Sequence, residues 1–459
     1  MISKPLTSRP WYDVIWRRLT PTLLALASST SAPTLASAGL FDARMFQLSN
    51  GMQVVLIPDH RAPVVTHMLW YRVGSADEPP GKSGLAHFFE HLMFKGTPNH
   101  PGDAYARLID GAGGGLNAFT SYDYTAYYAT VGTESLELVM TLEADRMMNL
   151  TLSEEKVRVE REVIVEERRL RIDTDPEALL HEQVMATLFL NHRYGMPVIG
   201  WLHEIRSWTL DDALAFYRRW YHPSNAILVV AGDVVLDRLQ TLAEQHYGVL
   251  PPAQPSVRKR PVEPEHIAAR RVAMRDARIK RPLWIRLYLA PAYGTAQKHR
   301  TSAVEVLAEL LGGGPSSLLY RRLVRTLGLA AEISVAYSPA AIDQTTLTIV
   351  AVPAPGVSTS DLEQAIDREV RRIRDGMIDE AEVQRVQQKL RAHAIRLRDG
   401  TLPAAQMVGA ALSTGATLDE IDTWPARIGA VTAADVRAEA TALLRDEASV
   451  TGVLMPNKE

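Results

Sequence analysis

The chain of 459 residues is long enough for two or more ordinary domains, and 46% of its residues are apolar. Its net charge of −3 gives no electrostatic argument for binding nucleic acid. It contains no cysteine, so no disulfide stabilises the fold, and any zinc ion must be held by nitrogen and oxygen ligands.

The first 38 residues are typical of an export signal. Arg17 and Arg18 precede a mildly apolar stretch that closes on the small-residue triplet Ala36-Ser37-Ala38. Prolines and serines interrupt this stretch, which is therefore too weakly apolar to span a membrane. We expect a signal peptide that is cleaved after Ala38 and a mature protein in a bacterial periplasm. The alternative is a disordered leader with no role in export.

The mature part opens with residues that favour strands. Within residues 44–59, the pair Asn50-Gly51 is a strong hairpin signal between two strand-like runs. Residues 64–75 predict a buried strand that ends at Gly74. A helix is expected directly afterwards, within 84-GLAHFFEHLMFKGT-97, so its residues should lie against the sheet.

The run 87-HFFEH-91 has the spacing of a metal site. On a helix, His87 and His91 project from the same face one turn apart, where a single tetrahedral Zn²⁺ can reach both imidazoles. Glu90 can accept a proton from a water that the metal activates, without being a ligand itself. The order H-x-x-E-H is the inverzincin motif. The alternative interpretation is a surface helix that merely carries polar residues.

The rest of the first half alternates predicted helices and strands. The expected helices cover residues 102–114, 134–148, 153–172 and 211–221. The expected strands cover residues 115–131, as a pair, and 226–234. The glycine triplet at 113–115 is not followed by the Gly-Lys-Ser/Thr of a phosphate loop, so we expect no nucleotide site.

Residues 251–265 contain five prolines and no helical or strand periodicity, which indicates a domain linker. Its basic run 258-RKR-260 is expected to be solvated. The second half then repeats the order of the first but has no H-x-x-E-H. The predicted strands cover residues 283–292 and 331–352, and the predicted helices cover 298–311, 359–375 and 379–397. The repeat suggests an internal duplication.

The run 84–97 resembles the signature of the pitrilysin family, which also contains insulin-degrading enzyme and mitochondrial processing peptidase. The similarity covers most of the mature chain, including residues 48–59, 117–128, 160–169, 217–234 and 312–323. The resemblance implies an α+β fold of two homologous domains, each an antiparallel sheet covered by helices. It also implies that the domains close like a clamshell around an unfolded peptide.

The chain is therefore predicted to consist of four segments. They are a signal peptide at 1–38, a catalytic zinc-binding peptidase domain at 39–250, the linker at 251–265 and a homologous C-terminal domain without a metal site at 266–459.

A catalytic zinc ion needs three protein ligands and one open position for water. Members of the family take the third ligand from a glutamate about 75 residues beyond the second histidine, preceded seven residues earlier by another glutamate. Glu167 stands 76 residues after His91 and seven after Glu160, so the resemblance makes Glu167 the ligand. Glu160, its partner on the same helix face, joins Glu90 as a predicted catalytic residue.

Two alternatives bear on the third ligand. Glu166 is one residue away, but on a helix it points roughly 100° from Glu167, so the two cannot exchange without turning the helix. The segment 154–169 is also rich in glutamate and arginine, as any solvated helix can be.

The resemblance makes 115-GLNAFT-120 an exposed sheet edge beside the zinc ion. A peptide could add to it as an extra strand through backbone hydrogen bonds that ignore sequence. The expected substrate-binding residues are Gly115, Leu116, Asn117, Ala118 and Phe119. The alternative is a hairpin in the interior of the sheet.

One departure from the family concerns the second domain. Active relatives carry, after a Ser-Ser-x-Leu stretch, an arginine and, seven residues later, a tyrosine that bind the substrate backbone and steady the tetrahedral intermediate. The aligned positions here are Val324 and Ala331, whose side chains donate no hydrogen bond. Arg325 is one residue off. Tyr320 and Tyr337 have the wrong spacing, although a shift of the loop could bring one of these two into place. Glu332, seven residues after Arg325, would repel an oxyanion.

We therefore expect a zinc-dependent endopeptidase for unfolded peptides, with one Zn²⁺ per chain and Glu90 as the general base. The missing pair predicts a heterodimer in which a zinc-less homologous subunit supplies the arginine and the tyrosine. The alternative is a non-catalytic scaffold or assembly subunit, because relatives in respiratory complexes resemble this fold but have lost motif residues. The complete motif of the chain favours the enzyme.

Overall fold

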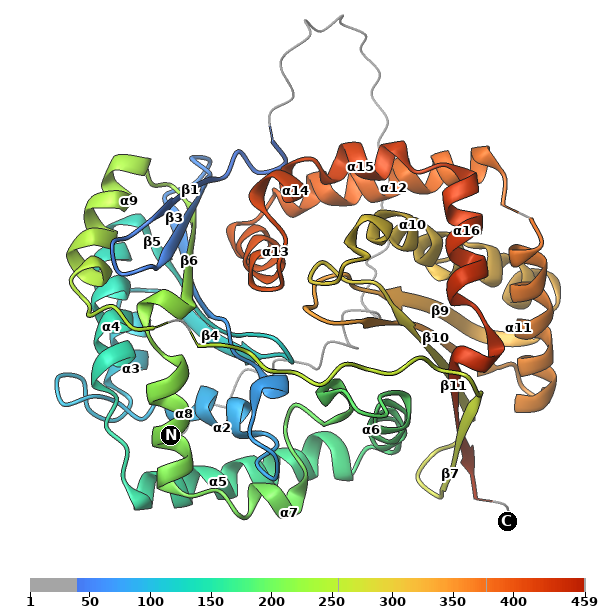
Figure 1. Ribbon diagram of the computed structural model, residues 1–459, viewed down its shortest axis with the longest axis horizontal. Coiled ribbons are helices and arrows are strands. Elements are labelled where there is room, and N and C mark those ends of the chain that lie inside the picture. Colours follow the sequence, from blue (N-terminus) through green and yellow to red (C-terminus); the bar gives the residue numbers. More distant parts are fainter. Residues whose placement is uncertain (1–38, 255, 377, 458–459) are drawn as a thin grey trace, which may run out of the picture. The chain divides into compact units, whose positions relative to one another are not determined.

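The computed structural model describes residues 39–254, 256–376 and 378–457 (Figure 1). The predicted signal peptide lies outside these described residues, so its cleavage after Ala38 stays a prediction. Within the described residues, no helix combines the length and the apolar character that crossing a membrane requires.

Six strands form the first sheet, in the order β1-β2-β6-β3-β5-β4. They are β1 (Arg44–Gln47), β2 (Gln53–Pro58), β3 (Val64–Tyr71), β4 (Gly115–Thr120), β5 (Thr125–Gly132) and β6 (Ala226–Gly232). The hairpin expected around Asn50-Gly51 is confirmed, because β1 and β2 pair in antiparallel register. Every residue of β6 is buried, as expected for a strand inside a sheet that is covered on both faces.

The predicted helices of the first half are present, and three further ones accompany them. The helices are α2 (Leu85–Leu92), α3 (Ala104–Gly111), α4 (Leu136–Asn149), α5 (Glu154–Arg168), α6 (Pro176–Leu188), α7 (Leu202–Ile205), α8 (Leu210–Trp220) and α9 (Leu236–Ala243). The sequence analysis missed α6, α7 and α9. For α6 a start signal exists, since the side chain of Asp175 accepts hydrogen bonds from the first-turn amides and proline follows it.

The second sheet repeats the order of the first one. Its strands run β7-β11-β8-β10-β9, with β7 (Arg270–Asp276), β8 (Leu283–Ala290), β9 (Ala330–Tyr337), β10 (Thr345–Pro353) and β11 (Ser449–Pro456). Neighbouring strands are antiparallel apart from one parallel pair in each sheet, β2 with β6 and β7 with β11. The parallel pairs stand at equivalent places in the two sheets, which agrees with an internal duplication. The sheets were expected to be antiparallel, and each therefore differs from that expectation by one parallel pair.

Seven helices of the second half are described. They are α10 (Thr301–Gly312), α11 (Thr359–Arg374), α12 (Glu380–Leu397), α13 (Thr401–Ser413), α14 (Leu418–Asp422), α15 (Trp424–Ala430) and α16 (Ala433–Leu443). The first three were predicted, whereas α13 to α16 and the strands β7 and β11 were not.

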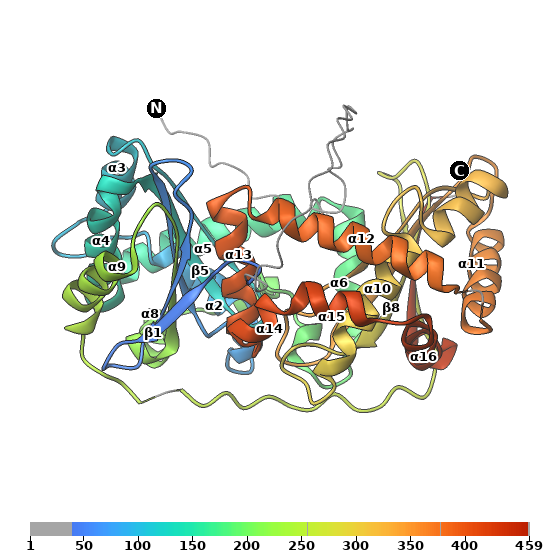
Figure 2. The ribbon, with the colours of Figure 1, turned by 90° about the horizontal axis from the view of Figure 1, so that it is seen from above.

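Each half lends one helix to the other half's sheet. Helix α13 contacts β3 and β6 (Figure 1 and Figure 2), and a Cβ atom added to Gly409 would lie 2.0 Å from Cε2 of the fully buried Trp70. Helix α6 contacts β7 and β11, where Leu180 and Val184 share a core with Val450. A cut at the predicted linker would therefore expose both sheets.

The segment 251–267 contains no helix or strand among its described residues, as expected for the predicted linker. The expectation that its basic run is solvated was wrong. The side chains of Arg258 and Arg260 are only 17% and 6% exposed, while Lys259 between them is exposed. In an extended chain successive side chains point to opposite sides, so one arginine on each side of Lys259 faces inward.

Candidate metal centre

Helix α2 begins at a tightly fixed point. Gly84 precedes it with a φ of 85°, and a Cβ atom there would lie 2.3 Å from the carbonyl oxygen of Ile199. The carboxylate of Glu78 accepts hydrogen bonds from the amides of Gly84 and Ala86 at 2.9 and 2.8 Å. These contacts fix where the metal motif of α2 lies relative to its neighbours.

The two histidines of α2 meet a glutamate of α5. The Nε2 atoms of His87 and His91 lie 3.7 and 3.4 Å from Oε2 of Glu167, and the ligand atoms of all three residues lie within 4.8 Å of one another. Ligand atoms at 2.0–2.1 Å around a tetrahedral zinc ion are separated by about 3.3 Å, so the spacing fits such an ion. Oε2 of Glu167 is buried without a hydrogen-bond partner among the described residues. A cation at this point would satisfy it.

Glu160 and Lys95 surround the ligands on one side. Nδ1 of His91 lies 2.9 Å from Oε1 of Glu160, and Oε2 of Glu160 forms an ion pair with Lys95. The carboxylate thus fixes the ring of His91 through Nδ1 and leaves Nε2 for a metal. Glu160 therefore contacts the ring of a predicted ligand and is not one of the three residues whose ligand atoms gather.

Lys95 was missed by the sequence analysis, although it stands one helical turn after His91 within the quoted motif. Oε1 of Glu167 is likewise paired with Nη1 of Arg171 at 2.9 Å, one turn further along its own segment. For Arg171 the i,i+4 spacing from Glu167 was the available signal, whereas Lys95 pairs with Glu160, which is distant in the sequence, so no local signal pointed to it.

The ionisation of the ligands suits a cation. Burial lowers the pKa of His87 to about 4, so its imidazole is neutral at pH 7. Burial also opposes the charged form of His91, but the carboxylates of Glu160 and Glu167 beside it raise its pKa to about 10. Burial would raise the pKa of Glu167, yet the adjacent His91 and the other charges nearby lower it to about 2. A zinc ion would therefore take the place of a proton on His91.

Glu90 lies on α2 between the two histidines and is buried. Its Oε2 accepts a hydrogen bond from Oγ1 of Thr120 at 2.6 Å, and burial raises its pKa. Thr120 is the last residue of β4, so this contact joins the predicted general base to the predicted substrate strand. Like Lys95 and Arg171, Thr120 was not singled out by the sequence analysis.

The placement of β4 agrees with the edge that was expected and not with an interior hairpin. Among the described strands β4 pairs only with β5, and it ends the sheet order. Within it Gly115 is exposed, Ala118 is buried, and Leu116, Asn117 and Phe119 lie between these extremes. The ring of Phe119 packs edge-to-face on Trp70 at 5.5 Å between centroids, so it faces the core.

Glu166, the alternative third ligand, points away from the histidines. Its carboxylate is exposed and forms an ion pair with Arg169, with distances of 2.6 and 2.8 Å. Glu167 is therefore the glutamate that α5 presents to the two histidines.

The second half places no arginine or tyrosine at the two aligned positions. Val324 packs against the core, and Ala331 lies within β9. The exposed Arg325 lies over the ring of Tyr320, at 5.9 Å from its centroid. The hydroxyl of Tyr337 donates a hydrogen bond to the carbonyl oxygen of Pro291 at 2.7 Å. Arg325, Tyr320 and Tyr337 thus each have a partner within the second half.

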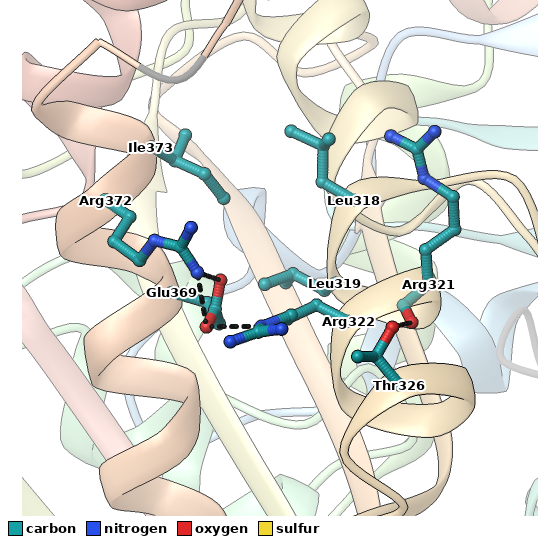
Figure 3. A pocket seen from close by; sticks show the side chains of 8 residues that line it. All are labelled: Leu318, Leu319, Arg321, Arg322, Thr326, Glu369, Arg372 and Ile373. Carbon is teal, nitrogen blue, oxygen red and sulfur yellow. Dashed lines mark hydrogen bonds and ion pairs between the residues drawn. The ribbon is translucent and has the colours of Figure 1, made fainter.

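A small cavity of about 210 Å³ lies elsewhere, between the segment Tyr320–Thr326 and α11 (Figure 3). The guanidinium groups of Arg322 and Arg372 both reach the carboxylate of Glu369, at about 3.1 Å. Its lining includes none of the three residues of the candidate metal centre. Because its central charges are paired with one another, the cavity does not compete with the metal centre as a site of chemistry.

The sequence of the chain is similar to known families and proteins. Residues 53–200 match the family described as insulinase, peptidase family M16, and residues 207–390 match the peptidase M16 inactive domain. The zinc protease PqqE of Helicobacter pylori is 32% identical over 344 residues, which cover 74% of this chain and 76% of that protein. An uncharacterized zinc protease of Mycobacterium leprae is 33% identical over 392 residues, which cover 83% of this chain and 80% of that protein.

Solved structures share the fold. The crystal structure of a protease from Helicobacter pylori has a TM-score of 0.84 at 28% identity and covers 90% of this chain and 99% of its own. The first half of the periplasmic protease PqqL from Escherichia coli has a TM-score of 0.75 and covers 90% of this chain and 92% of its own. At 20% identity, the second likeness concerns the fold alone.

Proposed function

This chain belongs to the insulinase family, peptidase family M16, and on that premise we propose that it is a zinc-dependent endopeptidase that hydrolyses unfolded peptides. The observation that carries the proposal is the meeting of ligand atoms from His87, His91 and Glu167, where Oε2 of Glu167 is buried and accepts no hydrogen bond from the described residues. The relatives named zinc proteases support a peptidase that uses zinc.

In this proposal His87, His91 and Glu167 hold the zinc ion, and Glu90 accepts a proton and later releases it. A zinc ion bound there would supply Lewis acidity, which polarises a peptide carbonyl and favours the loss of a proton from water. Oγ1 of Thr120 donates a hydrogen bond to Oε2 of Glu90, so Oε1 is the oxygen left to accept that proton. Because burial raises the pKa of Glu90, its carboxyl group can hold the proton and then deliver it to the leaving nitrogen.

We propose further that the peptide binds as an added strand along β4. Edge strands carry unpaired backbone groups, which bind an extended peptide whatever its side chains are. Residues Gly115 to Phe119 would supply these groups, while Phe119 keeps its ring on Trp70. The contact between Thr120 and Glu90 supports this reading, since it brings the end of the strand to the general base.

The proposal includes a second, zinc-less homologous subunit. The side chains of Val324 and Ala331 cannot donate hydrogen bonds to a substrate, and the hydroxyl of Tyr337 donates to the carbonyl oxygen of Pro291. A partner that carries the arginine and the tyrosine would complete the chamber. The periplasm is the proposed location, since the leader is typical of export and PqqL, which shares the fold, is a periplasmic protease.

The experiment for this proposal is the substitution Glu90→Gln, assayed on an unstructured peptide with the partner subunit present. Glutamine keeps the shape of the side chain but cannot take a proton, so the cleavage rate should fall at least about a hundredfold while the zinc content stays unchanged. Glu166→Gln is the matched control on an exposed glutamate and should cleave at the wild-type rate. Wild-type cleavage by Glu90→Gln would refute the role of Glu90.

A further inference from the structure

Arg260 stands at the centre of a buried cluster of charged side chains that lies outside the metal centre. Its Nε and Nη2 atoms lie 3.0–3.1 Å from the carboxylate of Asp77, and its Nη1 atom is paired with Asp123. Nη1 also lies 3.1 Å from Oδ2 of Asp343. The side chains of Arg260, Asp77 and Asp123 are 6%, 1% and 3% exposed, so this is a desolvated cluster and not a surface ion pair.

One side of the cluster is the turn that follows β4. Asp123 lies in this turn, which joins β4 to β5. The amides of Ser75 and Ala76 donate hydrogen bonds to the carbonyl oxygens of Ser121 and Tyr122, both at 3.0 Å. Asp77 closes the same short helical turn, η1 (Ser75–Asp77). Arg260 therefore binds both the end of the β4–β5 hairpin and the segment that supports it.

The other side of the cluster is the loop between β9 and β10 in the second half. The amide of Ile342 donates to Oδ2 of Asp123 at 3.1 Å, and the amide of Asp343 donates to the hydroxyl oxygen of Tyr194 at 3.2 Å. The hydroxyl of Tyr194 in turn donates to the carboxylate of Asp123, at 2.6–2.7 Å from its oxygens. The loop thus reaches the same aspartate that Arg260 binds.

This loop is also firmly held by its own half. The amide of Gly294 donates to the carbonyl oxygen of Ala341 at 3.0 Å, and the amide of Tyr293 donates to that of Pro339 at 2.8 Å. A Cβ atom on Gly294 would lie 2.2 Å from the carbonyl oxygen of Ile342, so there is no free space behind the loop. The loop is therefore closely packed against the segment that follows β8, so a displacement of the loop would also displace this part of the second half.

We propose that Arg260 and Asp343 are positioning residues, which fix the second half against the end of β4 and so set where a peptide on β4 lies relative to the second half. The part that concerns the peptide rests on the proposed function. The junction itself does not, because it is made of contacts within this chain. A segment that looked like a solvated linker is thereby assigned a role in aligning the two halves.

The test compares Asp343→Asn with Asp276→Asn, in the full mature chain. Asp343→Asn removes the carboxylate of the second half and leaves Arg260 paired with Asp77 and Asp123, so the fold should persist. Asp276 makes an ion pair with Arg278 two residues away, belongs to the second half and lies outside the cluster of Arg260, so it serves as the matched control. Arg260→Met is the stronger variant, since it removes the cation from the buried carboxylate of Asp123 and leaves that of Asp77 with the cation of Arg258, at 3.8 Å.

The first readout is amide hydrogen exchange in residues 120–125 and 338–344. Asp343→Asn should speed exchange in both segments by at least about tenfold, and Arg260→Met by more, while Asp276→Asn changes neither. The zinc content and the unfolding midpoint of Asp343→Asn should match those of the wild type. Wild-type exchange of both segments in Asp343→Asn and Arg260→Met would overturn the junction.

The second readout separates positioning from mere stability. With the partner subunit present, Asp343→Asn should raise the KM for an unstructured peptide by about tenfold and change kcat less, because the site is intact but the strand is displaced. An unchanged KM would overturn the role in placing the peptide. If the wild-type enzyme cleaves no peptide at all, the proposed function fails, and the exchange measurement still decides the junction.

Discussion

The imidazole of His91 is held at both of its nitrogen atoms by carboxylates, one from Glu160 and one from Glu167. Such a carboxylate behind a ligating histidine orients the ring and raises its basicity. Lys95 pairs with Glu160, and Glu160 in turn contacts the proposed ligand His91. The affinity for zinc should therefore depend on a residue that never touches the ion.

Replacing Glu160 with alanine should weaken zinc binding by about ten- to a hundredfold without abolishing it, because His91 loses its orientation but remains a ligand. Glu155→Ala is the control on the same helix, since Glu155 is exposed and pairs with Arg158 three residues further along. Competition with a chelator of known affinity measures both dissociation constants. An equal affinity in the two variants would rule out the positioning role of Glu160.

Glu305 gives the second half a pH-dependent stability. Its carboxylate lies 3.1 and 3.2 Å from Nε1 of Trp424, and burial raises its pKa from 4.5 to about 7. A carboxyl group with a raised folded-state pKa stabilises the fold while it is protonated. This contribution is fully present below about pH 4.5 and is lost as the pH rises through about 7.

We therefore expect Glu305→Gln to be more stable than the wild type at pH 8, by about 3 kcal/mol, and to differ by less than about 1 kcal/mol at pH 5. Urea unfolding at the two pH values, followed by circular dichroism, gives the comparison. Glu265→Gln, at a glutamate with 76% exposure, controls for the loss of one charge. If the stability difference does not change with pH, Glu305 does not titrate as described.

At the scale of the helices and strands, α13 makes a close contact between the halves. Gly409 faces Trp70, and a methyl group at this position would overlap the indole ring. The indole is fully buried between the sheet and the helix and packs on Phe119 and Tyr124 at its edges. The ring therefore has no room to move aside without shifting the strands below it.

Gly409→Ala should lower the free energy of unfolding by about 1–3 kcal/mol or more, although alanine is the better helix former. Gly429→Ala on α15 is the matched control, because the nearest atom to its Cβ is Nη1 of Arg391 at 3.8 Å. That variant should be neutral or slightly stabilised. Thermal unfolding of both decides the matter, and equal stabilities would show that α13 does not bear on Trp70.

The sequence predicts elements well where the periodicity is local and poorly where burial is complete. The hairpin at Asn50-Gly51, the helix of the zinc motif and the amphipathic α8 and α11 all follow from turn chemistry or helical spacing. Helix α13 was missed because small and apolar residues cover most of its surface, which leaves no polar face. Strand β11 was missed because its partners β7 and β8 stand more than 150 residues earlier in the chain.

The site follows the same rule. His87, Glu90 and His91 share one helix, so their spacing was enough to predict that they stand together. Glu167 needed the family spacing, because nothing local in a helix rich in glutamate distinguishes it from Glu166. Thr120 and the partners of Arg260 could not be found, since only the folded sheet brings them together.

At the scale of the whole molecule, the chain is expected to depend on a partner. The side chains at positions 324 and 331 cannot donate hydrogen bonds to the substrate carbonyl. The loss of such a donor typically lowers the rate by about 10²- to 10³-fold. The mature chain alone should therefore cleave unstructured peptides at a rate on the order of 1% or less of the rate reached with a zinc-less homologue.

The assay is peptide cleavage with the chain alone, with the homologue alone and with both. A homologue whose corresponding arginine is changed to alanine is the control, and should bind this chain without activating it. Full activity of the chain alone, unchanged by the partner, would contradict the heterodimer and return Arg325 or Tyr337 to consideration.

The central claim is that His87, His91 and Glu167 hold one zinc ion, and the metal content of the purified mature chain tests it most directly. Elemental analysis should find about one zinc ion per chain in the wild type and in Glu166→Gln, and nearly none in His91→Ala and Glu167→Gln. Zinc retained in full by His91→Ala and Glu167→Gln, or lost in Glu166→Gln, would contradict the assignment of the site.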